Sequence, residues 1–187
     1  DVYKRQKEVM EAAEAAGKEL AFEASVGGGI PIIDPLKHSL IANEITSVMG
    51  IVNGTTNYML TRMADNGLSY EDALHEAQQK GFAEADPTAD VGGFDAAAKI
   101  AILASIAFNS RVTLDDVFTD GITNISPVDI EAARDMGYVI KLLAIAHRRE
   151  DGVDVRVHPT MIPTNHQLAT VNGVFNAIYV VGDFVGE

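Results

Sequence analysis

Four carboxylates and one lysine lie close together near the middle of the sequence, and these residue types could support proton transfer. The carboxylates are Glu84, Asp86, Asp90 and Asp95, and the lysine is Lys99. Asp95 and Lys99 are four residues apart, so in a helix they lie on the same face. Residues 96–108 are apolar except for Lys99 and Ser105, a pattern typical of a helix that is buried on all sides.

The chemistry available to Lys99 depends on whether that helix is buried. A buried lysine must be paired or must lower its pKa, because desolvation disfavours the ammonium form. A lysine held by Asp95 can then donate and accept a proton near neutral pH. A solvated ion pair, worth about a few tenths of a kcal/mol, is the alternative interpretation of the same spacing.

A divalent-metal site is a further interpretation of the four carboxylates, because Mg²⁺ and Ca²⁺ prefer oxygen ligands. Their spacing does not fit an EF-hand loop. A metal-dependent lyase that uses Glu84, Asp86, Asp90 and Asp95 would be the corresponding function.

The elements that must position these residues are indicated by capping residues and hydrophobic periodicity. Helices are predicted over residues 7–17, after Asn53-Gly54, from Ser69 to Gly81, over 94–108 and from Ser126 to Gly137, with a short turn after Thr113. Strands are predicted over 20–26, 141–147, 153–157 and 174–181. Helices followed by clustered strands favour an α+β domain with a mostly antiparallel sheet that helices cover on one face.

The composition excludes several classes of function. The 187 residues include 14 Lys and Arg against 27 Asp and Glu, a formal net charge of −13, which argues against nucleic-acid or anionic-membrane partners. The absence of cysteine excludes disulfides, thiolate metal sites and a cysteine nucleophile. The apolar runs fall short of the ~20 residues that cross a bilayer, and no signal-peptide pattern is visible, so we expect a cytoplasmic protein.

Three longer motifs resemble the homoserine dehydrogenase family. They are FEASVGGGIPII at residues 22–33, GIVNGTTNYML at 50–60 and the acidic segment 81–99. Members of that family reduce aspartate 4-semialdehyde to homoserine with NADPH or NADH, on the route to threonine, methionine and isoleucine. The resemblance implies an NAD(P)-dependent oxidoreductase that places a carbonyl against the nicotinamide and supplies a proton.

The resemblance also implies roles for individual residues. Lys99 matches the proton donor and acceptor, and Asp95 matches the carboxylate that orients it and binds substrate. Glu84 matches the group that holds the ammonium of the substrate, and Asp90 is a further candidate in the same cluster. Gly81 matches a backbone position near the cofactor.

The segment around Thr55 is a further candidate for substrate binding. We interpret Asn53-Gly54-Thr55-Thr56 as the start of a helix, whose free N–H groups could hold the carboxylate of the substrate. An ordinary helix cap without a ligand is the alternative interpretation.

A sodium site is implied in the first motif. The family binds the ion at positions that match Glu23, Val26, Gly28 and Ile30. Alternate carbonyls of an extended chain point the same way, so the last three residues could present oxygens beside the Glu23 carboxylate. A flexible turn through the consecutive glycines is the alternative interpretation.

The domain organisation follows from the part of the family that is missing. The Gly-rich fingerprint of a dinucleotide-binding fold does not occur. We therefore expect residues 1–29 to be the last helix and strand of a truncated Rossmann domain. Residues 30–187 are expected to form the substrate-binding, catalytic and dimerisation domain, incomplete at its C-terminal end.

The activity and assembly of the chain follow as further expectations. A chain cut at both ends should turn over little or no substrate by itself. The family is usually dimeric through this region, so a homodimer is expected. A non-catalytic dimerisation module is the alternative from another functional class.

Overall fold

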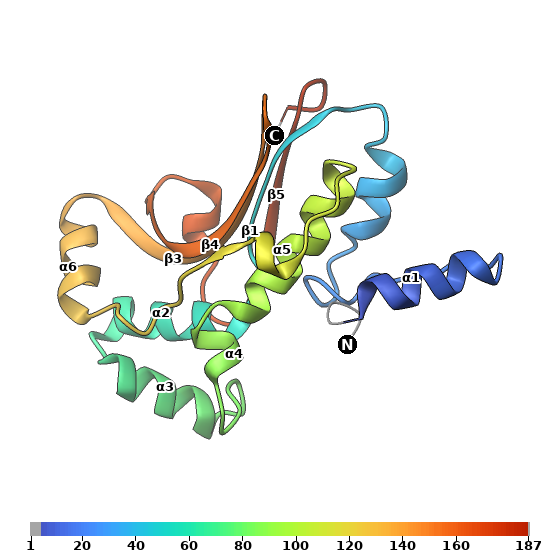
Figure 1. Ribbon diagram of the computed structural model, residues 1–187. Coiled ribbons are helices and arrows are strands. Elements are labelled where there is room, and N and C mark those ends of the chain that lie inside the picture. Colours follow the sequence, from blue (N-terminus) through green and yellow to red (C-terminus); the bar gives the residue numbers. More distant parts are fainter. Residues whose placement is uncertain (1–4, 187) are drawn as a thin grey trace.

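The computed structural model describes residues 5–186, and its centre is one five-stranded sheet (Figure 1). The strand order is β2 (Phe118–Thr119), β4 (Gly152–Pro163), β3 (Tyr138–Arg149), β1 (Ile45–Ile51) and β5 (Ala177–Gly182). Neighbouring strands are antiparallel except for the short parallel pair of β2 with β4. The predicted α+β class with a mostly antiparallel sheet is confirmed.

The helices are α1 (Gln6–Ala15), α2 (Gly54–Asn66), α3 (Tyr70–Gln79), α4 (Thr88–Val91), α5 (Phe94–Ala107) and α6 (Pro127–Asp135), with the short turns η1 (Pro35–Ser39), η2 (Leu114–Asp116) and η3 (Gln167–Thr170). Helices α2, α3 and α6 begin where the capping residues predict, whereas the short α4 was not predicted. The side chains of Asn53, Ser69 and Ser126 each accept a hydrogen bond from a backbone N–H in the first turn. In the described part of the chain, no helix is long and apolar enough to span a bilayer.

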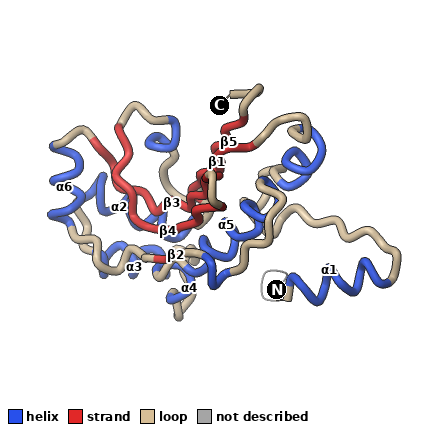
Figure 2. The backbone as a smooth tube through the Cα atoms, turned by 45° about the horizontal axis from the view of Figure 1, so that its top comes forward, coloured by secondary structure: helices blue, strands red, loops and turns tan. Residues whose placement is uncertain are grey.

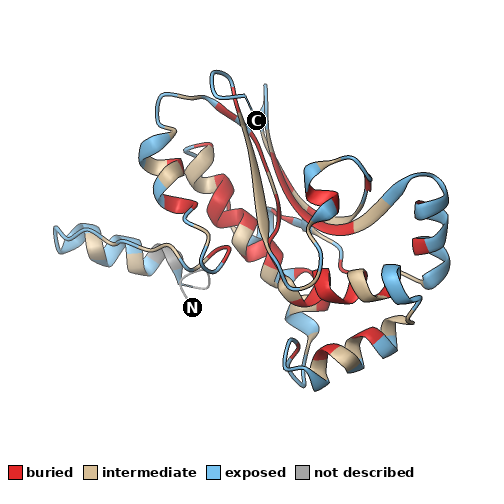
Figure 3. Cartoon of the chain, turned by 180° about the vertical axis from the view of Figure 1, so that it is seen from behind, coloured by how far each residue is buried: buried red, intermediate tan, exposed pale blue. Residues whose placement is uncertain are grey.

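Helix α5 crosses one face of the sheet and forms the centre of the main core (Figure 2). Its alanine, isoleucine and leucine side chains are buried on nearly all sides, as the apolar run predicts (Figure 3). Val48, Ala144 and Val157 face it from β1, β3 and β4. Because the first turns of α5 carry Asp95 and Lys99, this core fixes the place of both residues.

The opposite face of the sheet is only partly covered. Ile51, Leu143 and Ile162 form a smaller cluster there with Leu168 of η3. Side chains alternate between the two faces of a strand, so Arg156, next to the core residue Val157, belongs to this second face. The helices therefore lie mainly on one face, as predicted.

Helix α1 lies beside the main body, at the side away from α6, and most of its described side chains are exposed (Figures 1 and 3). The strand predicted over residues 20–26 is wrong, because the chain there is irregular and ends in turns. A strand needs a neighbour to pair its backbone groups. No strand of the described residues pairs with this segment.

A close contact between two backbone segments holds α4 in place. Ile122 N donates a hydrogen bond to Val91 O at 2.8 Å. A Cβ atom added to Gly121 would lie 2.0 Å from the same oxygen, so only glycine fits there. This contact ties the end of α4, close to Asp90, to the segment that follows β2.

Candidate active site

Asp95 and Lys99 form an ion pair in the first turns of α5, with 2.6 Å between Lys99 Nζ and Asp95 Oδ2. Each side chain is 20% exposed, so the pair is largely shielded from water. Lys99 Nζ also donates to Val52 O at 2.8 Å, just beyond the end of β1. The predicted pairing of these residues is therefore present, and it joins α5 to the central sheet.

Asn53 connects this pair to a second carboxylate. Its side-chain Nδ2 donates to Asp90 Oδ1 at 2.7 Å and to Asp95 Oδ2 at 2.9 Å. Its Oδ1 accepts from Thr56 N at 2.9 Å and caps α2. Sequence reasoning identified Asn53 only as the start of a helix. The signal available was that an asparagine cap uses its oxygen and leaves two amide hydrogens for other partners.

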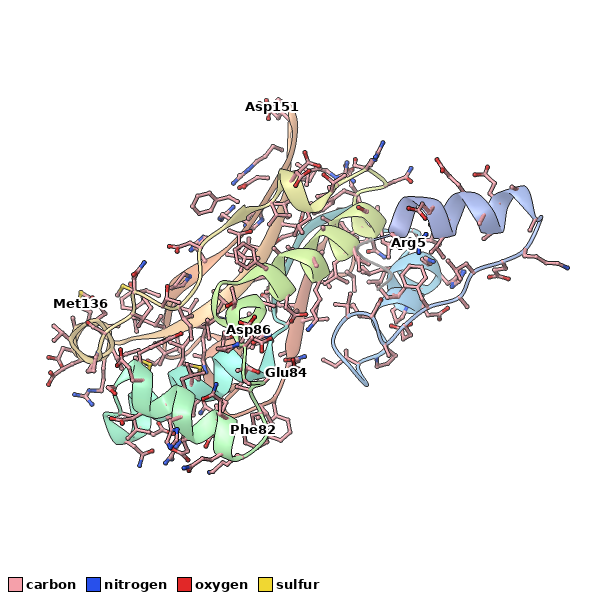
Figure 4. The ribbon with its side chains drawn as sticks, turned by 60° about the horizontal axis from the view of Figure 1, so that its bottom comes forward. Arg5, Phe82, Glu84, Asp86, Met136 and Asp151 are labelled. Atoms are coloured by element: carbon pink, nitrogen blue, oxygen red, sulfur yellow. The ribbon has the colours of Figure 1, made fainter. Side chains whose placement is uncertain are left out.

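A pocket of about 430 Å³ lies against the same carboxylates. Its walls come from the turn after α3 and from the starts of α4 and α5, and they include Gly81, Phe82, Glu84, Asp86, Asp90 and Asp95. Phe82, Glu84 and Asp86 follow one another along the turn (Figure 4). The structure therefore brings four of the predicted substrate and cofactor residues, at positions 81, 84, 90 and 95, to one pocket.

Thr55 lies behind the pocket wall and supports the turn. Its Oγ1 donates to Phe82 O at 2.6 Å, and the residue is only 8% exposed. The N–H group of Thr56 is occupied by the Asn53 cap. If the start of α2 meets a carboxylate, the N–H groups of Gly54 and Thr55 are the ones left for it.

A cluster around Glu76 holds the other side of the turn. Glu76 accepts hydrogen bonds from Lys80 at 2.9 Å, Tyr58 Oη at 2.7 Å and Arg62 Nε at 3.1 Å. Donation by Lys80, then by Tyr58 and Arg62, lowers the pKa of Glu76 to about 2. The Tyr58 ring meets the Phe82 ring edge-on with 4.9 Å between centroids, so the cluster packs directly on the pocket turn.

Asp86 is already engaged within its own turn. Its Oδ1 accepts from Thr88 Oγ1 at 2.6 Å and from Thr88 N at 3.1 Å, and these hydrogen bonds lower the pKa of Asp86. Among the described residues, no group of three or more His, Asp or Glu side chains could hold a metal ion. The divalent-metal interpretation of the four carboxylates therefore gains no support from the geometry.

Glu23, a predicted sodium ligand, caps the chain that leads into η1. Its Oε1 accepts from Ile32 N and Ile33 N at 2.6 Å each, and its Oε2 accepts from Asp34 N at 2.9 Å. Burial raises the pKa of Glu23, but the three hydrogen bonds outweigh it and the net pKa is lowered. The carboxylate thus stays ionised over a wider pH range than an exposed glutamate.

The other predicted sodium ligands lie in a turn. Gly27 and Gly28 both have left-handed backbone angles, with φ of 71° and 59°. The segment is therefore not extended, and the argument from alternate carbonyls of an extended chain is wrong. Ser25 Oγ is buried in this segment without a hydrogen-bond partner among the described residues. An unpaired buried oxygen is suited to an ion or a water molecule.

Lys141 is a buried cation outside the pocket. It is 3% exposed, and its Nζ donates to Asn57 Oδ1 at 3.1 Å, Val171 O at 2.7 Å and Asn172 Oδ1 at 2.9 Å. Burial lowers its pKa to about 8, and the charge of Asp65 opposes that shift in part. The contacts fasten the loop before β5 to α2.

Comparison with known proteins identifies one family. The family model described as homoserine dehydrogenase matches residues 31–187. The homoserine dehydrogenase of Corynebacterium glutamicum is 55% identical over an alignment of 185 residues, and the match covers 96% of this chain and 42% of that protein. The homoserine dehydrogenase of Bacillus subtilis is 49% identical over 180 residues, with the same coverage of 96% and 42%.

Solved structures with a similar fold point to the same family. A homoserine dehydrogenase from Thiobacillus denitrificans superposes with a TM-score of 0.96 and 48% identity over 99% of this chain and 43% of that one. A putative homoserine dehydrogenase from Archaeoglobus fulgidus gives a TM-score of 0.89 and 40% identity over 99% of this chain and 56% of that one. The chain thus spans less than half the length of the curated relatives it matches.

Proposed function

Because this chain belongs to the homoserine dehydrogenase family, we propose that it carries the substrate-binding and proton-transfer region for reduction of aspartate 4-semialdehyde to L-homoserine. The observation that carries the proposal is the shielded Lys99–Asp95 pair beside a pocket lined by carboxylates. The substrate has one ammonium group and one aldehyde. Carboxylates suit the first, and a proton donor suits the second.

The reaction adds a hydride to the carbonyl carbon and a proton to its oxygen, which turns the aldehyde into an alcohol. Bound NADPH or NADH would supply the hydride. The Lys99 ammonium has three hydrogens, of which Asp95 Oδ2 and Val52 O accept two. The third is left for the carbonyl oxygen of the substrate, and oxidation of homoserine would return the proton to Lys99.

The pocket residues would orient the rest of the substrate. Glu84, Asp90 and Asp95 would hold its ammonium group. The N–H groups of Gly54 and Thr55, for which the described residues offer no acceptor, would meet its carboxylate. Gly81 has a left-handed φ of 75° and nothing within 4 Å of the place where a Cβ would stand. The backbone there is open enough for a cofactor to approach closely.

We propose a sodium ion in the turn that contains Val26, Gly28 and Ile30, next to Glu23. The unpaired Ser25 Oγ supports it, because an ion or its water would satisfy that oxygen. Thermal unfolding in NaCl against KCl tests the site. A higher unfolding midpoint in NaCl than in KCl at equal ionic strength is expected, and equal midpoints would contradict a sodium site.

We also propose that residues 1–29 belong to a cofactor-binding domain and that 30–187 form the substrate domain. The exposed α1 and the start of the family match at residue 31 support this division.

The homodimer would use the sheet face opposite α5, where Met49 is only partly covered. Met49→Glu should convert a dimer to a monomer in sedimentation velocity, and an unchanged mass would contradict this interface. The cytoplasmic location stays a prediction that cell fractionation can test.

Two measurements test the catalytic proposal. L-homoserine should bind this 187-residue chain in a calorimetric titration, and no binding would favour the non-catalytic dimerisation module. A hybrid enzyme, in which this chain replaces the matching region of the Corynebacterium glutamicum relative, should lose about 10²–10⁴-fold in kcat on Lys99→Ala. Lys37→Ala, at a lysine of η1 outside the pocket, is the control. An unchanged kcat in the Lys99 variant would show that Lys99 does not transfer the proton.

A further inference from the structure

The side chain of Asn53 joins two carboxylates that belong to different helices. Asp90 lies in α4 and Asp95 in α5, and a glycine pair at residues 92–93 separates the two helices. Asn53 itself is the N-cap of α2, just beyond the end of β1, and is 5% exposed. Its amide therefore forms a buried link between three elements.

Each hydrogen of the Asn53 amide has its own acceptor. One points to Asp90 Oδ1 at 2.7 Å and the other to Asp95 Oδ2 at 2.9 Å. Like charges would otherwise repel across this short gap, and a shared donor stabilises both at a fixed separation. Among the described residues, no hydrogen bond reaches Asp90 Oδ2 or Asp95 Oδ1. Because both residues line the pocket, these second oxygens remain available to a ligand.

We propose that Asn53 is a positioning residue, which holds Asp90 and Asp95 so that their free oxygens can bind the ammonium group of the substrate together. The inference rests on the proposed function for the identity of that substrate. Asn53 acts through the two carboxylates. It also fixes the position of the Lys99 ammonium indirectly, because Asp95 Oδ2 accepts hydrogen bonds from both Asn53 and Lys99.

The same side chain has a structural role that must be separated from this one. Asn53 Oδ1 caps α2 through Thr56 N. Serine is about as good a cap as asparagine, but its shorter side chain has one hydrogen and cannot bridge two carboxylates. Asn53→Ser therefore removes the bridge and keeps the cap.

Calorimetric titration with L-homoserine compares the full 187-residue chain with its Asn53→Ser variant. We expect affinity to fall about tenfold or more, because hydrogen bonds to charged groups contribute at that level, and the thermal midpoint to fall as well, because the two carboxylates lose their shared donor. Ser126→Ala is the matched control, since it removes the cap of α6 far from the pocket and should lower the midpoint without changing affinity. Equal affinities for the parent and Asn53→Ser would overturn the proposal.

A ligand-free measurement separates this proposal from the function. In ¹H–¹⁵N spectra of the parent chain, we expect both side-chain amide protons of Asn53 to be protected from exchange. One should move in Asp90→Asn and the other in Asp95→Asn. Side-chain amide protons that exchange freely, and whose signals move in neither variant, would refute the bridge. A parent chain that shows the protected amide but binds no homoserine would refute the proposed substrate and leave the bridge standing.

Discussion

Lys141 should make the stability of this protein rise with pH. The residue is 3% exposed, and within residues 5–186 its ammonium donates hydrogen bonds to neutral oxygens of Asn57, Val171 and Asn172. Burial, opposed in part by Asp65, lowers its pKa from 10.5 to about 8. A group with a lowered pKa loses its proton more easily in the folded chain than in the unfolded chain.

The sign and size of the effect follow from proton linkage. Below pH 8 both states hold the proton, so the cost of burying the charge is fully present. Between pH 8 and 10.5 the unfolded state holds more protons, so the free energy of unfolding increases with pH. The interval from about 8 to 10.5 corresponds to about 3 kcal/mol, of which about 2.5 kcal/mol is gained by pH 10.

Urea unfolding of the parent and of Lys141→Met from pH 7 to pH 10 measures this effect. The methionine variant leaves three oxygens without a donor, but that cost does not change with pH and therefore drops out of the comparison. Lys141→Gln, which keeps an amide donor and no charge, is a second reference. A difference between parent and variants that stays constant from pH 7 to pH 10 would refute the linkage.

Three further substitutions test the core, the backbone contact and the turn. Leu103→Ala should destabilise the chain by about 2–5 kcal/mol in urea unfolding, because its side chain is fully buried in α5; a cost typical of an exposed site would contradict that burial. Gly121→Ala should cost about 3 kcal/mol or more, since its Cβ would meet Val91 O, whereas Gly29→Ala has free space and should be nearly neutral. Glu76→Gln should lower the thermal midpoint at pH 6. The difference in midpoint between the parent and the variant should vanish as pH falls from 4.5 towards 2. The charge of Glu76 stabilises the folded chain fully above about pH 4.5, and this stabilisation is lost by about pH 2.

Local signals predicted most of the helices because their causes are local. Ser69 and Ser126 cap helices through hydrogen bonds to residues three positions later, so the sequence alone contains both partners. The burial of α5 was likewise visible, since thirteen successive residues offer only Lys99 and Ser105 as polar side chains. The pairing of Asp95 with Lys99 follows from helical geometry.

The parts that could not be predicted depend on distant partners. The segment 20–26 has the residue types of a strand, but no neighbouring strand among the described residues completes it. The bridge from Asn53 to Asp95 joins residues 42 positions apart, and no local pattern encodes that distance. Three consecutive glycines permit the left-handed backbone angles found at Gly27 and Gly28, but they permit an extended chain equally well.

The burial of α5 also decides which wall of the pocket can move. Amide protons of a helix enclosed in the main core exchange with solvent only when the whole domain opens, whereas exposed turns open locally at much lower free energy. Asp95 and Lys99 therefore stand on the slow-exchanging side. The turn at residues 81–86, which is exposed except at Ala83, forms the opposite wall. We therefore expect local opening of the pocket to occur at this turn, while Asp95 and Lys99 stay in place.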